Sequence, residues 1–362
     1  MLSSDADGLS SRGAAVEIAD RPRREVTLAD VARAAGVSKS TASKALRDKY
    51  GVGADTRTRV REVAEKLGFR PSAVARQLTA GRTGTVGILT NDLEGRFVIP
   101  ILAGAEDALG AGELSVILCD ARGDAIRERR HLRTLLERRI DGLIVVGGAR
   151  TEPRPSLGRD LPLPVVYAYA PSADPEDVSV AADDRLGGLL AAEHLWSIGR
   201  RSIAYIGGDP TYDASRERAE GARAALAALG GELITAPMSA GSWTERWGRL
   251  ATARLLDEQP GIDAFIAASD MLARAALDVL RDRRLRVPDD VAVMGFDNWP
   301  IIVTNTRPEL TSVDLGLQEL GRYAASRIFA ALSGEEVAPG LDLRPVRVVV
   351  RDSTVRNDVA AD

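Results

Sequence analysis

Apolar residues recur at helical spacing directly after a polar N-terminal stretch, residues 1–25. The first set follows the i, i+3, i+4, i+7 pattern of one helix face. Its members are Leu28, Val31, Ala32 and Ala35. Thr27 and Asp30 form a capping-box-like pair that predicts where this helix begins. Gly36 predicts its end, because glycine tolerates the left-handed conformation found after a helix C-terminus.

Two more helices are predicted after this turn. Ser38 can cap the second one, which would extend to about Arg47. Its inward or crossing positions are Thr41, Ala42, Ala45 and Leu46. A third helix, near residues 56–67, carries an apolar stripe and ends at Gly68. Because the first two helices are short and joined by a tight turn containing glycine, the pattern predicts a helix-turn-helix.

The second predicted helix has a polar outer face that suits DNA. Lys39, Ser40, Lys44 and Arg47 point away from its apolar side. Side chains near the start of such a helix reach base edges in the major groove, where Lys or Arg donates to guanine and Ser suits either base type. The small hydroxyl side chains that suit phosphate contacts are Thr41 and Ser43.

The distribution of charge supports this interpretation. The whole chain has a net charge of −4, but residues 21–82 contain fifteen Lys and Arg against six Asp and Glu, a local balance of +9. All the lysines lie in that stretch. A basic module on an acidic body is typical of a DNA-binding headpiece, because basic side chains displace counterions from phosphates.

From residue 85 onward, short Val/Ile/Leu runs alternate with helical patterns. The predicted strands are Thr85–Leu89, Leu114–Cys119, Leu143–Val146, Val165–Tyr167, Ser202–Ile206, Ala264–Ala267, Val291–Phe296 and Arg344–Val350. The predicted helices are Pro100–Leu109, Ile126–Arg138, Leu186–Ile198, Glu217–Leu229, Thr244–Glu258 and Met271–Arg283. This alternation predicts an α/β core with doubly wound parallel sheets. Its length is more than one sheet needs, so we expect two subdomains.

These patterns divide the chain into five segments. They are a disordered tail (1–25), the headpiece (26–70), a hinge (71–82), an effector-binding and dimerisation core (83–354) and a C-terminal tail (355–362). The hinge segment is too short to hold a helix alone in water, so we expect it to order only on DNA. No secretory signal or bilayer-length apolar run is evident, and Cys119 is the only cysteine. We therefore expect a cytoplasmic protein without a membrane partner.

The string VTLADVARAAGVSKSTASKALRDKYGVGADTRTRVREVAEKLGFRPSAVARQLTAGRTGTVGIL, residues 26–89, closely resembles the headpiece and hinge of the LacI/GalR family of bacterial repressors. The resemblance implies that Lys39, Ser40 and Lys44 read bases. It implies that Leu78 wedges into the minor groove at the centre of a palindromic operator, with Ala75 packed beside it. The full set expected at DNA is Thr27, Ser38, Lys39, Ser40, Thr41, Ser43, Lys44, Arg47, Ala75 and Leu78. Ser72 and Gly53 depart from the usual family residues.

The rest of the chain resembles the periplasmic-binding-protein-like core of the same family. The matching pieces are DDRLGGLLAAEHLWSIGRRSIAYIGG (183–208), SRERAEGARAAL (215–226) and VAVMGFDN (291–298). The resemblance implies that an effector binds between the subdomains. It implies contacts from Arg218 and Asp297, whose guanidinium and carboxylate suit vicinal hydroxyl groups, and from Trp243, Phe97 and Ser269.

Other functions find less support in the sequence. A solute-binding protein of a transport system would share the core but not the headpiece. An enzyme would need a nucleotide loop or an acid–base pair, and none is recognisable; His131 and His194 lack partners at metal-binding spacing. We expect no catalytic residue, cofactor or metal. The effector is expected to be a sugar, with a nucleobase or nucleoside left open. Because no leucine heptad follows the last strand, we expect a homodimer rather than a tetramer.

Overall fold

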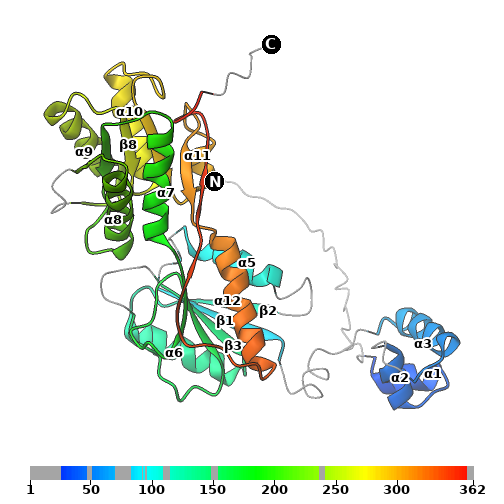
Figure 1. Cartoon of the computed structure of the whole chain (residues 1–362). Coiled ribbons are helices and arrows are strands. Elements are labelled where there is room, and N and C mark those ends of the chain that lie inside the picture. The colour runs from blue at the N-terminus through cyan, green and yellow to red at the C-terminus, as the bar shows by residue number, and fades with distance from the viewer. Residues whose placement is uncertain are drawn as a thin grey trace, which may run out of the picture. The chain divides into compact units, whose positions relative to one another are not determined.

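The computed structural model describes residues 26–46, 51–69, 83–91, 93, 96–108, 115–147, 154–235 and 241–356. The chain divides after Gly81 into two compact units, the headpiece and the core, whose elements appear in Figure 1. Several sequence predictions fall outside the described residues. They concern the N-terminal tail, the hinge with Ala75 and Leu78, Arg47, and residues 357–362.

The headpiece contains three helices, and each boundary has a local cause. They are α1 (Leu28–Ala34), α2 (Lys39–Leu46) and α3 (Ala54–Lys66). The predicted capping box is confirmed, because Thr27 Oγ1 accepts from Asp30 N at 3.3 Å and Asp30 Oδ2 accepts from Thr27 N at 3.0 Å. Ser38 Oγ caps α2 by accepting from Thr41 N at 3.0 Å. Gly36 and Gly68 adopt positive φ angles of 67° and 64° after their helices, as predicted.

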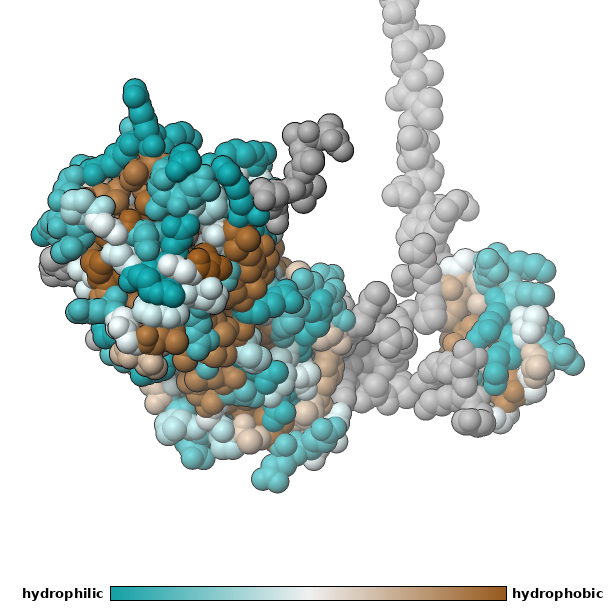
Figure 2. All heavy atoms as spheres, turned by 45° about the horizontal axis from the view of Figure 1, so that its top comes forward, coloured by the Kyte–Doolittle hydropathy of each residue, from teal (hydrophilic) through white to brown (hydrophobic). Residues whose placement is uncertain are grey.

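A small apolar core holds these helices together. Its buried members are Val31, Ala32, Ala35, Ala42, Ala45, Val60 and Ala64. Figure 2 shows mostly hydrophilic side chains on the visible headpiece surface. The third helix begins two residues earlier than predicted, at Ala54, and its N-cap Gly53 offers no side-chain hydrogen bond.

The core contains two six-stranded sheets, as the alternating pattern predicts. The first has the order β11-β5-β4-β3-β1-β2, and all its pairs are parallel. Its strands are β1 (Thr85–Thr90), β2 (Ser115–Asp120), β3 (Gly142–Val146), β4 (Val165–Ala168), β5 (Val178–Ala182) and β11 (Gly340–Arg344). The second has the order β12-β10-β9-β8-β6-β7. Its strands are β6 (Ile203–Ile206), β7 (Leu233–Thr235), β8 (Ala264–Ala267), β9 (Ala292–Phe296), β10 (Thr311–Asp314) and β12 (Arg347–Val349).

Helices cover the sheets and define two subdomains. The N-terminal subdomain has the first sheet with α5 (Val98–Ala108), α6 (Ala125–Glu137) and α12 (Leu317–Leu332). The C-terminal subdomain has the second sheet with α7 (Asp184–Ser197), α8 (Asp213–Ala228), α9 (Glu245–Glu258), α10 (Asp270–Asp282) and α11 (Pro300–Val303). Figure 1 shows α7 to α10 gathered around β8, and α5, α6 and α12 around β1 to β3. Central strands such as β3 and β9 are buried throughout, as expected for parallel sheets with both faces covered.

One sequence prediction is wrong, and several elements were missed. The single strand predicted over Arg344–Val350 is two strands, β11 in the first sheet and β12 in the second, where β12 pairs antiparallel with β10. The valine-rich pattern of residues 344–350 does not show that the chain leaves one sheet for another. The strands β5, β7 and β10 and the helices α11 and α12 were not predicted. The chain also changes subdomain between β5 and α7 and between β10 and α12.

Paired glycines bring helices into backbone contact in both subdomains. A Cβ atom at Gly188 of α7 would overlap the carbonyl oxygen of Arg218 in α8, and one at Gly221 of α8 would overlap that of Arg185 in α7. In the N-terminal subdomain, a Cβ atom at Gly104 of α5 would overlap the carbonyl oxygen of Gln318. One at Gly321 of α12 would overlap that of Ile101. The α7–α8 contact therefore fixes the relative position of two helices that carry functional side chains.

Among the described residues, no helix is both long and apolar enough for a membrane crossing.

Gly221→Ala should lower the free energy of unfolding of the core by about 1–3 kcal/mol, because the added methyl group overpacks the α7–α8 contact. The loss should occur although alanine is favoured over glycine by about 1 kcal/mol inside a helix. Chemical denaturation followed by tryptophan fluorescence measures this, since Trp196, Trp243, Trp247 and Trp299 all lie in the core. Gly261→Ala, where a Cβ meets no atom within 4 Å, is the control. Equal stability of the two variants would contradict the prediction.

Candidate functional site

The outer face of α2 is the candidate DNA-binding surface. Lys39, Ser40 and Lys44 are exposed, whereas Ala42 and Ala45 of the same helix are buried in the headpiece core. Because Ala42 and Ala45 pack in the apolar centre of the headpiece, the opposite, basic side of α2 is available to a partner. Lys39 at the first position of α2 and Lys44 in its last turn can reach phosphates or base edges in a groove wide enough for a helix.

The hydroxyl groups predicted at DNA lie at the starts of α1 and α2. Ser38 Oγ lies 2.8 Å from both Ser40 Oγ and Thr41 Oγ1. Thr27 and Ser38 are exposed and use their side-chain oxygens as helix caps, while Thr41 and Ser43 are half-buried. The structure therefore gathers Ser38, Ser40 and Thr41 into one hydroxyl cluster and gives Thr27 a capping role that is independent of DNA.

The candidate effector site lies where loops follow the carboxyl ends of parallel strands. Phe97 follows β1, Ser269 follows β8, and Asp297 follows β9. Arg218 projects from α8, which follows β6, and Trp243 precedes α9. Open parallel sheets bind ligands at this edge, because the loops of neighbouring strands meet there.

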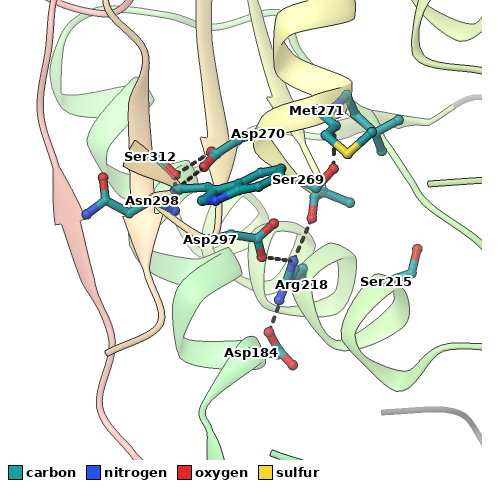
Figure 3. A network of polar contacts seen from close by, with 12 residues as sticks. Asp184, Ser215, Arg218, Ser269, Asp270, Met271, Asp297, Asn298 and Ser312 are labelled. Carbon is teal, nitrogen blue, oxygen red and sulfur yellow. Dashed lines mark hydrogen bonds and ion pairs between the residues drawn. The ribbon is translucent and has the colours of Figure 1, made fainter. Parts of the chain in front are cut away.

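Arg218 is deeply buried in this site, and Figure 3 shows its charged partners Asp184 and Asp297. Only 1% of the residue is exposed. Its Nε donates to Asp184 Oδ1 at 2.7 Å, its Nη1 donates to Ala268 O at 2.5 Å, and Nη1 lies 3.6 Å from Asp297 Oδ1. Burial alone lowers the pKa of Arg218, but the charges of Asp184 and Asp297 outweigh it and raise the pKa. Arg218 therefore stays charged in the interior.

Asp297 has an unusual backbone as well as a buried carboxylate. Its φ angle is 101° and that of Asn298 is 50°, conformations that cost energy in residues other than glycine. Hydrogen bonds hold this segment: Asp297 N donates to Val313 O at 2.9 Å, and Asn298 N donates to Ser312 Oγ at 3.0 Å. The strained turn aims the Asp297 side chain at Arg218 (Figure 3).

Arg96 reaches this carboxylate from the N-terminal subdomain. Its Nε and Nη2 donate to Asp297 Oδ2 at 3.1 and 2.5 Å. Its guanidinium carbon lies 5.0 Å from the ring centroid of Phe97 and 5.4 Å from that of Trp299. Asp297 thus lies between guanidinium groups of the two subdomains.

Asp270 forms a second buried carboxyl beside the first. Ser312 Oγ donates to its Oδ1 at 2.6 Å, and Trp299 N donates to its Oδ2 at 2.7 Å (Figure 3). Gly295 leaves room for it, because a Cβ there would overlap the carboxyl group. Burial, and next the charge of Asp297, raise the pKa of Asp270 well above its usual range.

The aromatic residues lie on both sides of this network. Phe97 stacks on Tyr169, with 4.5 Å between ring centroids. Trp243 packs its ring on Gly208 and meets the Tyr212 ring edge-on at 5.7 Å. Aromatic faces of this kind suit the apolar face of a sugar ring. Ser269 is completely buried and caps α10 by accepting from Leu272 N, so its hydroxyl already has a structural use.

Sequence reasoning missed several members of this site. Asp184 was not among the predicted site residues, but its carboxylate pairs with Arg218. Arg96 stands directly before the predicted Phe97, and an arginine in the loop after the first strand was the available signal. Asp270 stands between the predicted contact Ser269 and the predicted helix Met271–Arg283, and it was not predicted as a site residue. Within the described part of the chain, no group of His, Cys, Asp and Glu could hold a metal ion.

Asp270→Asn should make the free energy of unfolding less dependent on pH. The folded-state pKa of Asp270 is raised above the unfolded value of 3.8, so its stability contribution is complete at lower pH and is lost as the pH rises towards the folded-state pKa. From about pH 5 to about pH 8, the wild-type protein should therefore lose stability relative to the variant. Denaturation at each pH measures this, with the exposed Asp282→Asn as the control. A constant difference would contradict the assignment.

Comparisons with known proteins agree with this geometry. Residues 27–72 match the family model described as "Bacterial regulatory proteins, lacI family", and residues 192–354 match "Periplasmic binding protein-like domain". The chain is 33% identical to the HTH-type transcriptional regulator CelR of Thermobifida fusca over 338 residues, which cover 91% of this chain and 99% of that protein. It is 31% identical to catabolite control protein A of Priestia megaterium over 332 residues, with the same coverage of both chains.

Solved structures give the same result. The complex of the transcriptional regulator CelR with cellobiose is 30% identical, covers 91% of this chain and all of that chain, and has a TM-score of 0.60. The lac repressor dimer bound to operator and the anti-inducer ONPF is 25% identical, covers 92% of this chain and 100% of that chain, and has a TM-score of 0.69. The chain belongs to the LacI family of DNA-binding transcriptional regulators.

Proposed function

We propose that this regulator is a homodimeric repressor whose affinity for a pseudo-palindromic operator changes when a small carbohydrate binds between the subdomains of its core. The observation that carries the proposal is a set of buried polar atoms at the candidate site that have no hydrogen-bond partner among the described residues. The set comprises Ser215 Oγ, Arg218 Nη2, Trp243 Nε1 and Asp297 Oδ1. Buried polar groups normally have partners, so a ligand rich in hydroxyl groups would satisfy these atoms.

The proposed contacts combine polar and aromatic groups. Arg218 and Asp297 would bind neighbouring hydroxyl groups of the ligand through a donor and an acceptor lying 3.6 Å apart. Phe97 and Trp243 would lie against the sugar ring, and Ser269 would contribute at the edge of the site. Two relatives support a carbohydrate: one was solved with cellobiose, and the other with ONPF.

The proposed DNA contacts follow the exposed face of α2. Lys39, Ser40 and Lys44 would read bases, and the hydroxyl groups at the helix starts, with Arg47, would contact phosphates. Leu78 and Ala75 of the hinge would contact the minor groove at the operator centre. The relative solved on operator DNA is a dimer, and an inverted repeat matches the twofold symmetry of a dimer.

The two sites would communicate through the core. The chain passes between subdomains at β5–α7, β10–α12 and β11–β12, and Arg96 joins them at the site. A ligand that changes the contacts around Asp297 would therefore change how the subdomains meet. Couplings of this kind are typically worth about 1–3 kcal/mol.

Lys39→Ala and Lys44→Ala should each weaken binding to the operator by roughly tenfold to a hundredfold, because one base contact is worth about 1–3 kcal/mol. The operator is first selected from a random duplex pool and should be an inverted repeat. Titration at fixed salt measures the loss. Lys66→Ala, an exposed lysine at the end of α3, is the control and should bind almost normally. Selection of no sequence would contradict base reading by this helix.

A saturating carbohydrate effector should change operator affinity by about 5- to 150-fold. Titration of labelled operator with and without each sugar of a mono- and disaccharide panel, cellobiose included, measures this change. Trp243→Ala should weaken the response by raising the effector concentration required, while leaving operator affinity without sugar unchanged. Sugar binding that leaves operator affinity the same would show that the core does not act as a switch.

A further inference from the structure

Arg96 pairs with one oxygen of Asp297 and leaves the other oxygen to a ligand. Both of its bonds to the carboxylate end on Oδ2, whereas the proposed ligand contact is with Oδ1. The side chain of Arg96 is 16% exposed and that of Asp297 is 2% exposed, so this ion pair is largely shielded from water. A ligand bound at Asp297 Oδ1 therefore lies beside the Arg96 guanidinium without displacing it.

This arrangement bears on the chemical class of the effector. Arg96 and Arg218 both face Asp297, so a ligand bound there lies beside two guanidinium groups that share this carboxylate. An anionic group on the same ligand would pair with Arg96 while the ligand hydroxyls bind Asp297. We propose that Arg96 is a specificity-determining residue that selects a sugar carrying a carboxylate or phosphate group.

The hydrogen-bonding capacity of the site points the same way. The guanidinium groups of Arg96 and Arg218 make four hydrogen bonds to oxygen, far fewer than their N–H groups allow. Among the described residues, Arg96 Nη1 donates to the sulfur of Met271, a weak acceptor, and Arg218 Nη2 has no hydrogen-bond partner. A carboxylate or phosphate supplies several acceptor oxygens, and the planar fork of an arginine matches them.

The charges around the site do not oppose an anion. Asp184 and Asp297 balance Arg218 and Arg96. The remaining carboxyl, Asp270, has a pKa raised by burial and by Asp297, so its neutral form persists to higher pH.

This inference rests on the proposed function, and matched sugars test it. Glucose, glucuronate and glucose 6-phosphate, and the corresponding galactose series, are titrated into the full-length protein by calorimetry at fixed ionic strength. We expect at least one charged sugar to bind more tightly than its neutral parent by about tenfold or more. Whichever of the acid and the phosphate binds more tightly identifies the anion.

Three variants separate the role of Arg96 from general damage. Arg96→Gln should remove the preference for the charged sugar and leave binding of the neutral parent within a few-fold. Arg96→Lys, which keeps the charge but loses the fork, should keep part of the preference. Arg281→Gln, an exposed arginine of α10, should keep all of it.

Each other result counts against the inference. Neutral parents that bind as tightly as the charged sugars would overturn it and leave the proposed function intact. If Arg96→Gln tightened binding of every sugar equally, Arg96 would be a competitor of ligands and not a selector. If no sugar bound and none changed operator affinity, both this inference and a carbohydrate-controlled repressor would be wrong.

Discussion

The candidate effector site depends on keeping one guanidinium charge, that of Arg218, in the protein interior. A charge with 1% of its residue exposed needs compensation, and Asp184 and Asp297 supply it from α7 and from the turn after β9. Asp184 reaches Arg218 because α7 and α8 touch backbone to backbone at Gly188 and Gly221. Two glycines that bind no ligand themselves therefore position the Asp184–Arg218 ion pair.

The charges of this site are balanced, but several of its buried polar atoms have no hydrogen-bond partner among the described residues. A protein selected only for stability would pair the side-chain atoms of Arg218, Asp297 and Ser215 fully, because unpaired buried polar atoms cost free energy. The strained backbone of Asp297 and Asn298 adds to that cost. Both features suit binding of a ligand. Membership of a family of transcriptional regulators agrees with the prediction that the chain is not an enzyme.

The sequence predicted local elements well and long-range placement poorly. Caps and glycines are local signals, so Thr27, Ser38, Gly36 and Gly68 marked the headpiece helices correctly. The alternating pattern likewise revealed the two-sheet core. The sixteen-residue helix α12 was missed, although its apolar face packs on α5 and the first sheet. The run over Arg344–Val350 was misread because leaving one sheet for another leaves no mark in hydrophobicity.

At the site, too, the sequence predicted individual residues but not the contacts between them. Arg218 and Asp297 were found by resemblance, and the structure brings them to within 3.6 Å of each other. Arg96 and Asp184 acquire their roles only from contacts made 201 and 34 positions away, which no local pattern encodes. Arg96 is the informative case, because it connects the subdomains through the carboxylate that a ligand needs. Under the role proposed for Arg96, the choice of ligand and the contact between the subdomains depend on the same side chain.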